Sequence, residues 1–451
     1  MHMSSKLAKL GLFDAMVPRY TSYPTAPHFN TDVASGHVQS WIASIPAHST
    51  ISLYLHIPFC RSLCWFCACR TQGAPTLSPI AKYVETVRQE VALLGQFLPE
   101  GVTLSRMHWG GGTPTLLSAE MIDALSDAID KIAPLAPDAD FSVEIDVKEI
   151  DSARIDALVR AGLTRACIGV QDFDPEIQST IGRIQGFEVT RDATETLRAS
   201  NVKSLNADIL FGLPHQNETR IATSVQKLLT LNPDRVALYG YAHVPWMARR
   251  QCMIPSDTLP TPEKRLALFE TGRRLLDWDG YRQVGIDHFA RPEDSLTKAA
   301  ESGNLRRSFQ GYTDDPSSVL IGLGASAISR YPQGFAQNYG ATSDYAAAIG
   351  AGGFATHKGH ALTREDKLRA RIIESILCDF GVNNRSVAAE FPDDTALAAR
   401  LLQDLAGRFG DMVRLSEDGL HIKPEAQPLA RNMARHFDAY DMSTAGHATA
   451  V

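Results

Sequence analysis

Four of the seven cysteines in this 451-residue chain lie within one short segment, Cys60-Arg-Ser-Leu-Cys64-Trp-Phe-Cys67-Ala-Cys69. Thiolates this close together can wrap a single metal centre. A structural zinc site usually combines one Cys-x2-Cys pair with a second pair further along the chain, and the sequence holds no second pair. A two-cysteine redox motif would not need the other thiols. The segment therefore points to a different kind of metal centre.

The separations of three and two residues between Cys60, Cys64 and Cys67 fit three corners of a 4Fe–4S cube. The fourth iron then has no protein thiolate and can bind a substrate-like ligand. S-adenosylmethionine (SAM) can chelate this iron through its amino and carboxylate groups. An electron from a low-potential cluster then cleaves its carbon–sulfur bond and yields a 5′-deoxyadenosyl radical. On spacing alone, a zinc site or a chance match stays the alternative.

The composition is that of an ordinary globular protein and limits the possible functions. The chain has 44 Lys and Arg and 51 Asp and Glu, which gives a formal net charge of −7. A mildly acidic chain without a basic block is not expected to bind nucleic acid. No run approaches the roughly 18 to 20 apolar residues of a membrane span. Residues 1–9 lack the apolar region of a signal peptide, so we expect a cytoplasmic protein without a disulfide framework.

Short apolar or alternating runs recur with helical patterns between them, which predicts parallel βα units and a complete or partial barrel. The predicted strands are 51–57, 106–109, 140–146, 165–170, 204–211 and 235–242, with a weaker seventh at 282–286. A helix is expected after the first strand, with Ser78 and Pro79 at its cap and first turn. Another is expected behind Ser118.

Polar residues share one face of the predicted strands. Tyr54, Glu144 and Asp208 each lie on such a face, opposite apolar neighbours, because side chains alternate across a strand. We expect the apolar faces to hold helices and the polar faces to surround a polar ligand. The alternative, a sheet with one wet face, is less expected because parallel sheets are usually covered on both sides. The cysteine segment and Gln171 both follow strands, at the ends that form the active rim of βα folds.

The segment 346–354 is small and Gly-rich, which is typical of a linker. Behind it, Thr363 and Asp366 form a capping-box pattern at the start of a helical stripe. We therefore expect an N-terminal segment over residues 1–40 that closes the site, a partial barrel over 41–348 and a mostly helical C-terminal domain over 349–451. Residues from about Ser443 are expected to be frayed.

Ten motifs along the chain carry a wider resemblance. They are Pro18-Arg-Tyr-Thr-Ser-Tyr-Pro-Thr25, Tyr54-Leu-His-Ile-Pro-Phe-Cys60, Trp109-Gly-Gly-Gly-Thr-Pro114, Gly169-Val-Gln-Asp-Phe-Asp-Pro175, Arg183-Ile-Gln185, Asp208-Ile-Leu-Phe-Gly-Leu-Pro214, Tyr241-Ala-His-Val-Pro245, Asp287-His-Phe-Ala-Arg-Pro292, Phe309-Gln-Gly-Tyr312 and Gly324-Ala-Ser-Ala-Ile-Ser329. Together they resemble the oxygen-independent coproporphyrinogen III oxidase (dehydrogenase) family of the radical SAM superfamily, from near residue 17 through the C-terminal domain. Two departures are Ala68, where the family often has Gly, and Val147, where it often has Pro; neither removes a ligand.

The resemblance implies a fold and a reaction. The fold is α/β, an incomplete parallel (β/α)6 radical-SAM barrel with an N-terminal segment and a mostly helical C-terminal domain. Two propionate side chains of coproporphyrinogen III become vinyl groups, giving protoporphyrinogen IX and two CO2, after the adenosyl radical abstracts a hydrogen from the propionate β-carbon. The family also implies a 4Fe–4S cluster, two SAM molecules per site, a low-potential electron donor such as flavodoxin, and a monomer.

Family roles transfer to the matching residues of this chain. The resemblance assigns the cluster to Cys60, Cys64 and Cys67. The positions around the cluster-bound SAM are Tyr54, Gly111, Glu144 and Ile328. The positions around the second SAM are Phe66, Gly112, Thr113, Gln171, Arg183, Asp208 and Ala242. Cys69 matches a fourth cysteine that is not an ordinary cluster ligand in the family, and it is a candidate catalytic residue with a bystander thiol as the alternative.

The chemistry of these residues agrees with the implied roles, although each has a structural alternative. Glu144 and Asp208 can accept hydrogen bonds from ribose hydroxyls or form structural ion pairs. Arg183 can bind a carboxylate through its bidentate fork or lie on the surface. Gln171 can contact SAM or cap a turn, and Phe66 can stack on adenine or pack in the core.

Substrate contacts are predicted at the barrel mouth. Coproporphyrinogen carries four carboxylates, so arginines near the rim are expected. We expect Arg19 and Tyr20 to help close the site. Phe309 and Gln310, from the family's Phe-Gln-Gly-Tyr motif, are candidate catalytic residues.

Three competing functions stay open. Related haem chaperones share the barrel and the three cysteines but bind and transfer haem; they usually lack the fourth cysteine and the Arg-Tyr-Thr-Ser-Tyr-Pro segment, which are both present here. A radical SAM activity on another tetrapyrrole is the second alternative. A zinc-stabilised binding protein is the third.

Overall fold

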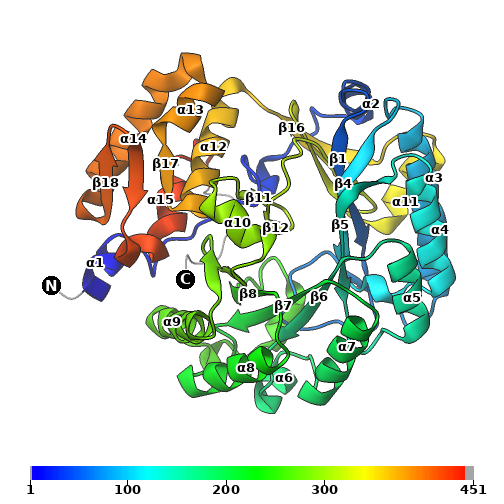
Figure 1. Cartoon of the computed structure of the whole chain (residues 1–451), viewed down its shortest axis with the longest axis horizontal. Coiled ribbons are helices and arrows are strands. Elements are labelled where there is room, and N and C mark those ends of the chain that lie inside the picture. The colour runs from blue at the N-terminus through cyan, green and yellow to red at the C-terminus, as the bar shows by residue number, and fades with distance from the viewer. Residues whose placement is uncertain (1–2, 442–451) are drawn as a thin grey trace.

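The computed structural model describes residues 3–441, so the fraying expected from about Ser443 lies outside the described residues. A twelve-stranded sheet within these residues curves into a partial barrel (Figure 1). Six neighbouring parallel strands form its wall in chain order: β1 (Thr50–Ile57), β4 (Thr103–Gly111), β5 (Leu135–Ile145), β6 (Arg165–Gln171), β7 (Ser204–Phe211) and β8 (Arg235–Gly240). The predicted incomplete (β/α)6 barrel is confirmed.

Helices cover the outer face of this wall (Figure 1). They are α3 (Ser78–Gly95), α4 (Ala119–Asp130), α5 (Ser152–Arg160), α6 (Pro175–Thr180), α7 (Phe187–Ala199), α8 (Glu218–Thr230) and α9 (Pro262–Trp278). Ser118 caps α4 as predicted, because its side chain accepts a hydrogen bond from the Met121 amide. Helix α3 instead has Leu77 at its N-cap, so Ser78 and Pro79 both lie in the first turn.

The sheet extends past the six barrel strands at both edges. Next to β1 come β13 (Leu320–Leu323), which is parallel to β1, and then the antiparallel β14 (Ile328–Tyr331), β15 (Gly334–Asn338) and β16 (Thr356–Ala361). Next to β8 come β10 (His288–Ala290) and β9 (Arg282–Val284), both antiparallel to their neighbours. The weak seventh strand predicted at 282–286 is therefore β9, an antiparallel edge strand and not a continuation of the barrel.

A hairpin of β11 (Arg306–Ser308) and β12 (Gly311–Thr313) lies between the two ends of the curved sheet (Figure 1). Residues of this hairpin line the barrel interior together with β1, β7 and β8. Helix α10 (Ser295–Glu301) precedes the hairpin. The hairpin thus closes the side that six strands leave open.

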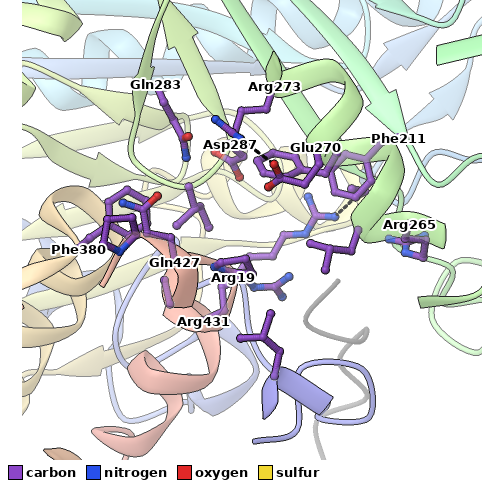
Figure 2. A pocket seen from close by; sticks show the side chains of 18 of the residues that line it. Arg19, Phe211, Arg265, Glu270, Arg273, Gln283, Asp287, Phe380, Gln427 and Arg431 are labelled. Atoms are coloured by element: carbon purple, nitrogen blue, oxygen red, sulfur yellow. Dashed lines mark hydrogen bonds and ion pairs between the residues drawn. The ribbon is translucent and has the colours of Figure 1, made fainter. Parts of the chain in front are cut away.

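A second hydrophobic core joins the two ends of the chain. It contains α12 (Arg364–Asp379), α13 (Asn384–Glu390), α14 (Thr395–Phe409), α15 (Ala430–His436) and the small sheet of β17 (Gly381–Asn383), β19 (Gly419–Ile422) and β18 (Val413–Ser416). Leu12, Tyr20 and Tyr23 of the N-terminal segment pack into this core, near helix α1 (Met3–Lys9). Thr363 and Asp366 form the predicted capping box of α12. A cavity of about 570 Å³ separates this region from the barrel (Figure 2).

The linker predicted over 346–354 is wrong in its first half. Helix α11 (Thr342–Gly350) runs through it, and Ile349 is buried in the main core. Three successive alanines favour a helix, and the apolar side chain finds a core to pack against. Strand β16 then rejoins the sheet before α12 begins. The proposed boundary at 348/349 therefore falls inside α11, and the division into three domains stays a prediction.

Two further facts complete the fold. Helix α2 (Ser35–Ala43) packs Trp41 and Ile42 into the main core. None of the helices within residues 3–441 is long and apolar enough to cross a membrane.

A buried carboxylate ties α3 to the loop that follows β13. Glu90 is 1% exposed. Three donors point at its carboxylate: the Gly324 amide at 2.7 Å, Asn338 Nδ2 at 2.8 Å and the Tyr345 hydroxyl at 2.6 Å. Burial raises the pKa of Glu90 to about 7, although the three donors act in the opposite direction. The loop is thereby fixed to the outer helix layer.

Tyr83, two turns earlier on α3, fastens the same loop to the barrel. Its hydroxyl accepts a hydrogen bond from the Ala325 amide at 2.9 Å and donates one to the His56 carbonyl at 2.7 Å. His56 lies at the end of β1, where the cysteine segment begins. Helix α3 therefore joins the start of that segment to the loop that leads to Ile328.

We expect the stability conferred by Glu90 to depend on pH. A carboxyl whose pKa is raised by folding is protonated more in the native state, so the native state loses stability as pH rises from the unfolded to the folded pKa. The free energy of unfolding of the wild-type protein should therefore fall by up to about 3 kcal/mol, relative to that of Glu90→Gln, between about pH 5 and about pH 8. Urea unfolding across this range measures the difference.

Glu85→Gln, on the exposed face of the same helix, is the matched control and should show no comparable trend. If the free energy of unfolding of the wild type instead rises with pH relative to that of Glu90→Gln, the three donors outweigh burial in setting the pKa of Glu90.

Candidate active site

The polar faces of the barrel strands surround one internal cavity of about 130 Å³. Its lining includes Ser52, His108, Ser142, Glu144, Cys167, Asn206 and Asp208, contributed by β1, β4, β5, β6 and β7. The predicted polar interior is confirmed, and the alternative of an ordinary sheet with one wet face is wrong, because the polar faces line this cavity. Burial raises the pKa of the Cys167 thiol to about 12, so this thiol is neutral.

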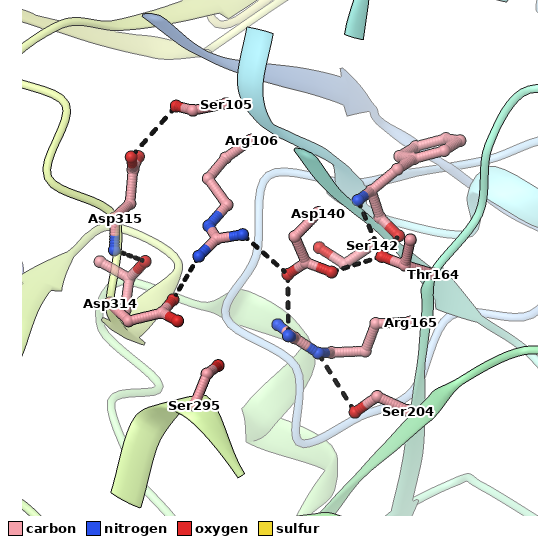
Figure 3. A network of polar contacts seen from close by, with 12 residues as sticks. Ser105, Arg106, Asp140, Ser142, Thr164, Arg165, Ser204, Ser295, Asp314 and Asp315 are labelled. Carbon is pink, nitrogen blue, oxygen red and sulfur yellow. Dashed lines mark hydrogen bonds and ion pairs between the residues drawn. The ribbon is translucent and has the colours of Figure 1, made fainter. Parts of the chain in front are cut away.

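Ion pairs close the end of the cavity formed by the amino ends of the strands (Figure 3). Arg106 Nη2 lies 2.7 Å from Asp314 Oδ1, and Arg165 Nη2 lies 2.8 Å from Asp140 Oδ2. Because these side chains are largely buried and occupied by one another, they serve the stability of the barrel. A ligand therefore enters from the opposite rim.

Glu144 lies toward the carboxyl rim, held by its neighbours. The Gly111 amide donates to Glu144 Oε2 at 3.0 Å, and His108 Nε2 lies 3.6 Å from Glu144 Oε1. Burial raises the pKa of Glu144, but His108 and the Gly111 amide outweigh burial and leave it below its usual value. The His108 ring stacks on Tyr54 with a centroid distance of 5.8 Å, and the Tyr54 hydroxyl pairs with His56 Nδ1 at 2.9 Å. An ionised carboxylate is thus ready to accept hydrogen bonds at the rim.

The other predicted acid, Asp208, has a different environment. It accepts a hydrogen bond from Asn206 Nδ2 at 2.9 Å, and burial raises the pKa of Asp208 to about 6. Gln171 ends β6 with a φ of 67°, at a register shift in the ladder. Because the backbone of Gln171 is in the left-handed region, the chain turns at this residue from β6 into the loop that follows. Gln171 therefore sets the direction of this loop at the carboxyl end of β6.

Backbone contacts fix the cysteine segment to the barrel. The short parallel strands β2 (Phe59–Cys60) and β3 (Gln72–Gly73) bracket it. The Gly112 amide donates to the Ile57 carbonyl at 2.8 Å, and a Cβ at position 112 would lie 2.5 Å from the Phe59 carbonyl oxygen. The glycine run is therefore required for a close backbone approach.

The thiols of the segment have the environment of metal ligands. Burial and the nearby charges of Cys67 and Cys64 raise the pKa of Cys60 to about 11, while hydrogen bonds with Thr113 and Thr71 act in the opposite direction. Arg183 Nη1 lies 3.5 Å from Cys64 Sγ. The Cys69 amide donates to Cys67 Sγ at 3.4 Å, and hydrogen bonds from the Cys69 thiol and amide lower the pKa of Cys67 to about 6. Positive charge and amide donors both favour thiolates.

The three thiols fit a cluster better than a single ion. Within residues 3–441, no three His, Cys, Asp or Glu side chains converge as the ligands of one metal ion do. A tetrahedral zinc site would require such convergence. A 4Fe–4S cluster does not, because each thiolate binds a different iron. Each of the seven cysteines is a free thiol.

Gln251 is a structural residue of the site that the sequence analysis missed. Its Nε2 donates to the Phe66 carbonyl at 2.7 Å and to the Ala242 carbonyl at 3.1 Å, while its Oε1 accepts from the Val244 amide at 2.6 Å. It thereby joins the cysteine segment to the loop after β8. A lone glutamine carries no sequence pattern that would have revealed this role.

The structure brings most predicted site residues to this rim but separates two of them. Gln310 lines the same cavity as Glu144 and Asp208. Phe309 points to a different cavity, of about 430 Å³, where its ring packs 6.0 Å from Phe335. Phe309 and Gln310 form the turn between β11 and β12, and their side chains line different cavities.

Arg19 lies near the barrel mouth, whereas Tyr20 is buried in the C-terminal core, and their expected role in closing the site stays a prediction. Arg19 Nη2 donates to the Gly240 carbonyl at the end of β8 at 2.5 Å. Tyr20 donates from its hydroxyl to Asp438 Oδ2 at 2.9 Å. The N-terminal segment therefore lies across the mouth and is fastened to the C-terminal region.

Comparisons with known proteins agree with this arrangement. Residues 54–228 match the family described as the Radical SAM superfamily. The chain is 57% identical over 451 residues to the oxygen-independent coproporphyrinogen III oxidase of Paracoccus denitrificans, with 100% of both chains covered. It is 57% identical over 439 residues to the protein of that name from Cereibacter sphaeroides, covering 97% of this chain and 98% of the relative.

A solved structure supports the same assignment over the whole fold. Coproporphyrinogen III oxidase from Escherichia coli, described as a radical SAM enzyme, superposes with a TM-score of 0.89 at 33% identity, covering 95% of this chain and 100% of the other. The resemblance found from the motifs is confirmed. The chain belongs to the oxygen-independent coproporphyrinogen III oxidase family of radical SAM enzymes.

Proposed function

We propose that this chain converts coproporphyrinogen III to protoporphyrinogen IX by oxidative decarboxylation of two propionate side chains to vinyl groups. The observation that carries this conclusion is similarity over the whole length, with three free thiols held at the rim of a polar barrel. Each propionate loses CO2 and one hydrogen of its β-carbon, and the remaining electron leaves to an acceptor. The reaction belongs to haem biosynthesis without oxygen.

The radical SAM family implies SAM and a 4Fe–4S cluster as cofactors. We assign the cluster to Cys60, Cys64 and Cys67. When bound, the reduced cluster and SAM together supply the radical that removes the hydrogen. Arg183 stabilises the Cys64 thiolate from 3.5 Å, and the Cys69 amide does the same for Cys67.

The residues around the cluster-bound SAM are Tyr54, Gly111, Glu144 and Ile328. Glu144 is ionised and accepts hydrogen bonds, as a ribose or an amino group requires. The Gly324 and Ala325 amides donate hydrogen bonds to Glu90 and Tyr83. These bonds fix the loop that leads to Ile328. Two SAM molecules per site serve the two propionates in this proposal. The residues for the second are Phe66, Gly112, Thr113, Gln171, Arg183, Asp208 and Ala242.

Substrate handling falls to residues at the rim. Gln310 projects into the barrel cavity and can donate to a propionate. Cys69, with a raised pKa caused by its bond to Cys67 and by burial, holds its proton at Sγ beside the cluster loop. Phe309 packs away from the cavity and is a positioning residue for the hairpin. The ion pairs at the far end of the cavity keep water from entering there.

The setting of the enzyme follows from its chemistry. A low-potential donor such as flavodoxin supplies the electron. The seven free thiols fit a reducing compartment, the cytoplasm. The enzyme works as a monomer in this proposal.

Replacing Cys64 with alanine should abolish turnover, because the cluster loses one of three thiolates. The measurement is an anaerobic assay with SAM, a reductant and coproporphyrinogen III, read by mass spectrometry for the loss of two carboxyl groups. Cys252→Ala removes an exposed thiol and should retain activity. Residual full activity of Cys64→Ala would contradict the cluster assignment. Stable haem binding by the wild-type protein, without SAM-dependent product, would favour a haem chaperone.

Gly112→Ala should lose most of its cluster without losing a ligand. The added Cβ would lie 2.5 Å from the Phe59 carbonyl oxygen, so the backbone beside Cys60 must move. Iron and sulfide content after anaerobic reconstitution measures the effect. Gly36→Ala, in α2 with open space around it, is the control. Equal iron content in both variants would show that the segment tolerates the displacement.

A further inference from the structure

The cavity between the barrel and the C-terminal region has an excess of positive charge. Its charged lining residues are Arg19, Arg265, Glu270, Arg273, Asp287, Arg307, Glu425 and Arg431. Arg273 is neutralised within its own helix, because its Nη2 lies 2.8 Å from Glu270 Oε2. The remaining guanidinium groups outnumber the remaining carboxylates. Figure 2 shows Arg19, Arg265, Arg431 and Asp287 around the same space.

Two of these arginines have hydrogen-bond donors without a partner. The Arg307 side chain is 5% exposed. Its Nε and Nη1 have no hydrogen-bond acceptor within the described chain, and neither has Arg265 Nε. Asp287 Oδ1 lies 3.8 Å from Arg307 Nη1, beyond hydrogen-bond distance. Donors without a protein acceptor that border a cavity can bind a negatively charged ligand there.

Mutual repulsion among the arginines points in the same direction. Burial and the charge of Arg19 lower the pKa of Arg265 to about 10. Burial, Arg19 and Arg307 lower the pKa of Arg431 to about 9. Arg431 Nη2 also donates to the Val17 carbonyl at 2.7 Å and so fixes the segment that carries Arg19. An anion would add the counter-charge that this cluster lacks.

The rest of the cavity wall is apolar. It includes Phe211, Leu266, Phe269, Ile286 and Phe380. The volume of about 570 Å³ lies within the range of small-molecule sites, about 300–1,000 Å³. Aromatic walls beside arginines suit a ligand with flat apolar rings and several carboxylates.

The cavity adjoins the candidate active site. Gly240 and Ala242, at and after the end of β8, line it. Arg19 Nη2 donates to the Gly240 carbonyl at 2.5 Å, at the end of β8. His288, which lines the barrel cavity, pairs through Nδ1 with Asp287 Oδ1 at 2.8 Å. A ligand in the arginine-lined cavity therefore lies next to the rim.

We propose that Arg19, Arg265 and Arg307 bind carboxylates of coproporphyrinogen III in this cavity. They hold the propionates that do not react in a given step, while the pyrrole rings lie against the phenylalanines and another propionate reaches the rim. This inference rests on the proposed function for the identity of the substrate.

A pair of porphyrins tests the carboxylate contacts on the wild-type holoenzyme. Coproporphyrin III has four free propionates, and its tetramethyl ester has the same ring with all four carboxyl groups esterified and uncharged. We expect coproporphyrin III to bind at least about tenfold more tightly, as the lost charge-assisted hydrogen bonds require. Porphyrin fluorescence during anaerobic titration measures both Kd values.

Variants then locate the contacts. Arg265→Gln should raise the Kd of coproporphyrin III and the KM for coproporphyrinogen III about tenfold or more, with a smaller effect on the Kd of the tetramethyl ester and on kcat. Arg265→Lys should recover part of the loss because it keeps the charge. Arg274→Gln is the matched control and should change neither constant, since Arg274 is an exposed arginine of the same helix α9 that does not line the cavity.

The results of these titrations and assays test the carboxylate site separately from the proposed function. Equal Kd values for the two porphyrins on the wild-type enzyme, or an unchanged Kd in Arg265→Gln, would overturn the carboxylate site. If Arg265→Gln fails to hold its cluster, the porphyrin pair on the wild-type enzyme still decides. Discrimination between the porphyrins without turnover of coproporphyrinogen III would count against the proposed function and leave the carboxylate site standing.

Discussion

The polar side chains on the inner face of this parallel barrel must be paired by hydrogen bonds or ion pairs, and the rest of the structure depends on this constraint. At the amino ends of the strands, Arg106 and Arg165 are neutralised by Asp140 and Asp314 in ion pairs. At the carboxyl ends, Glu144 and Asp208 are only partly satisfied by neighbours. Buried polar groups without full pairing are costly. The uneven distribution of pairing therefore directs ligand binding to one rim.

The cysteine segment depends on this rim for its geometry. It leaves β1 beside the glycine run and is held there by backbone contacts, by Arg183 and by Gln251. The outer helix α3 fixes the loop before Ile328 to the same end of β1 through Tyr83. The predicted metal ligands and the predicted SAM residues are thus positioned by one rigid frame, as precise positioning in an active site requires.

The two ends of the chain complete the site from outside the barrel. The N-terminal segment packs into the C-terminal core and carries Arg19 across the mouth. Arginines from α9, from β11 and from α15 then face the same cavity. The cavity is therefore lined by residues from the barrel, from the N-terminal segment and from the C-terminal region.

The sequence by itself determined the six parallel strands, their polar faces, the cysteine segment after the first strand and the family, because periodicity and motifs are local properties. It did not reveal the added edge strands, the helix through the expected linker, or the separation of Phe309 from Gln310. The roles of Gln251 and of Arg265, Arg307 and Arg431 were also decided by tertiary structure alone. A single glutamine or arginine has no pattern, and its function depends on which carbonyls and charges folding places around it.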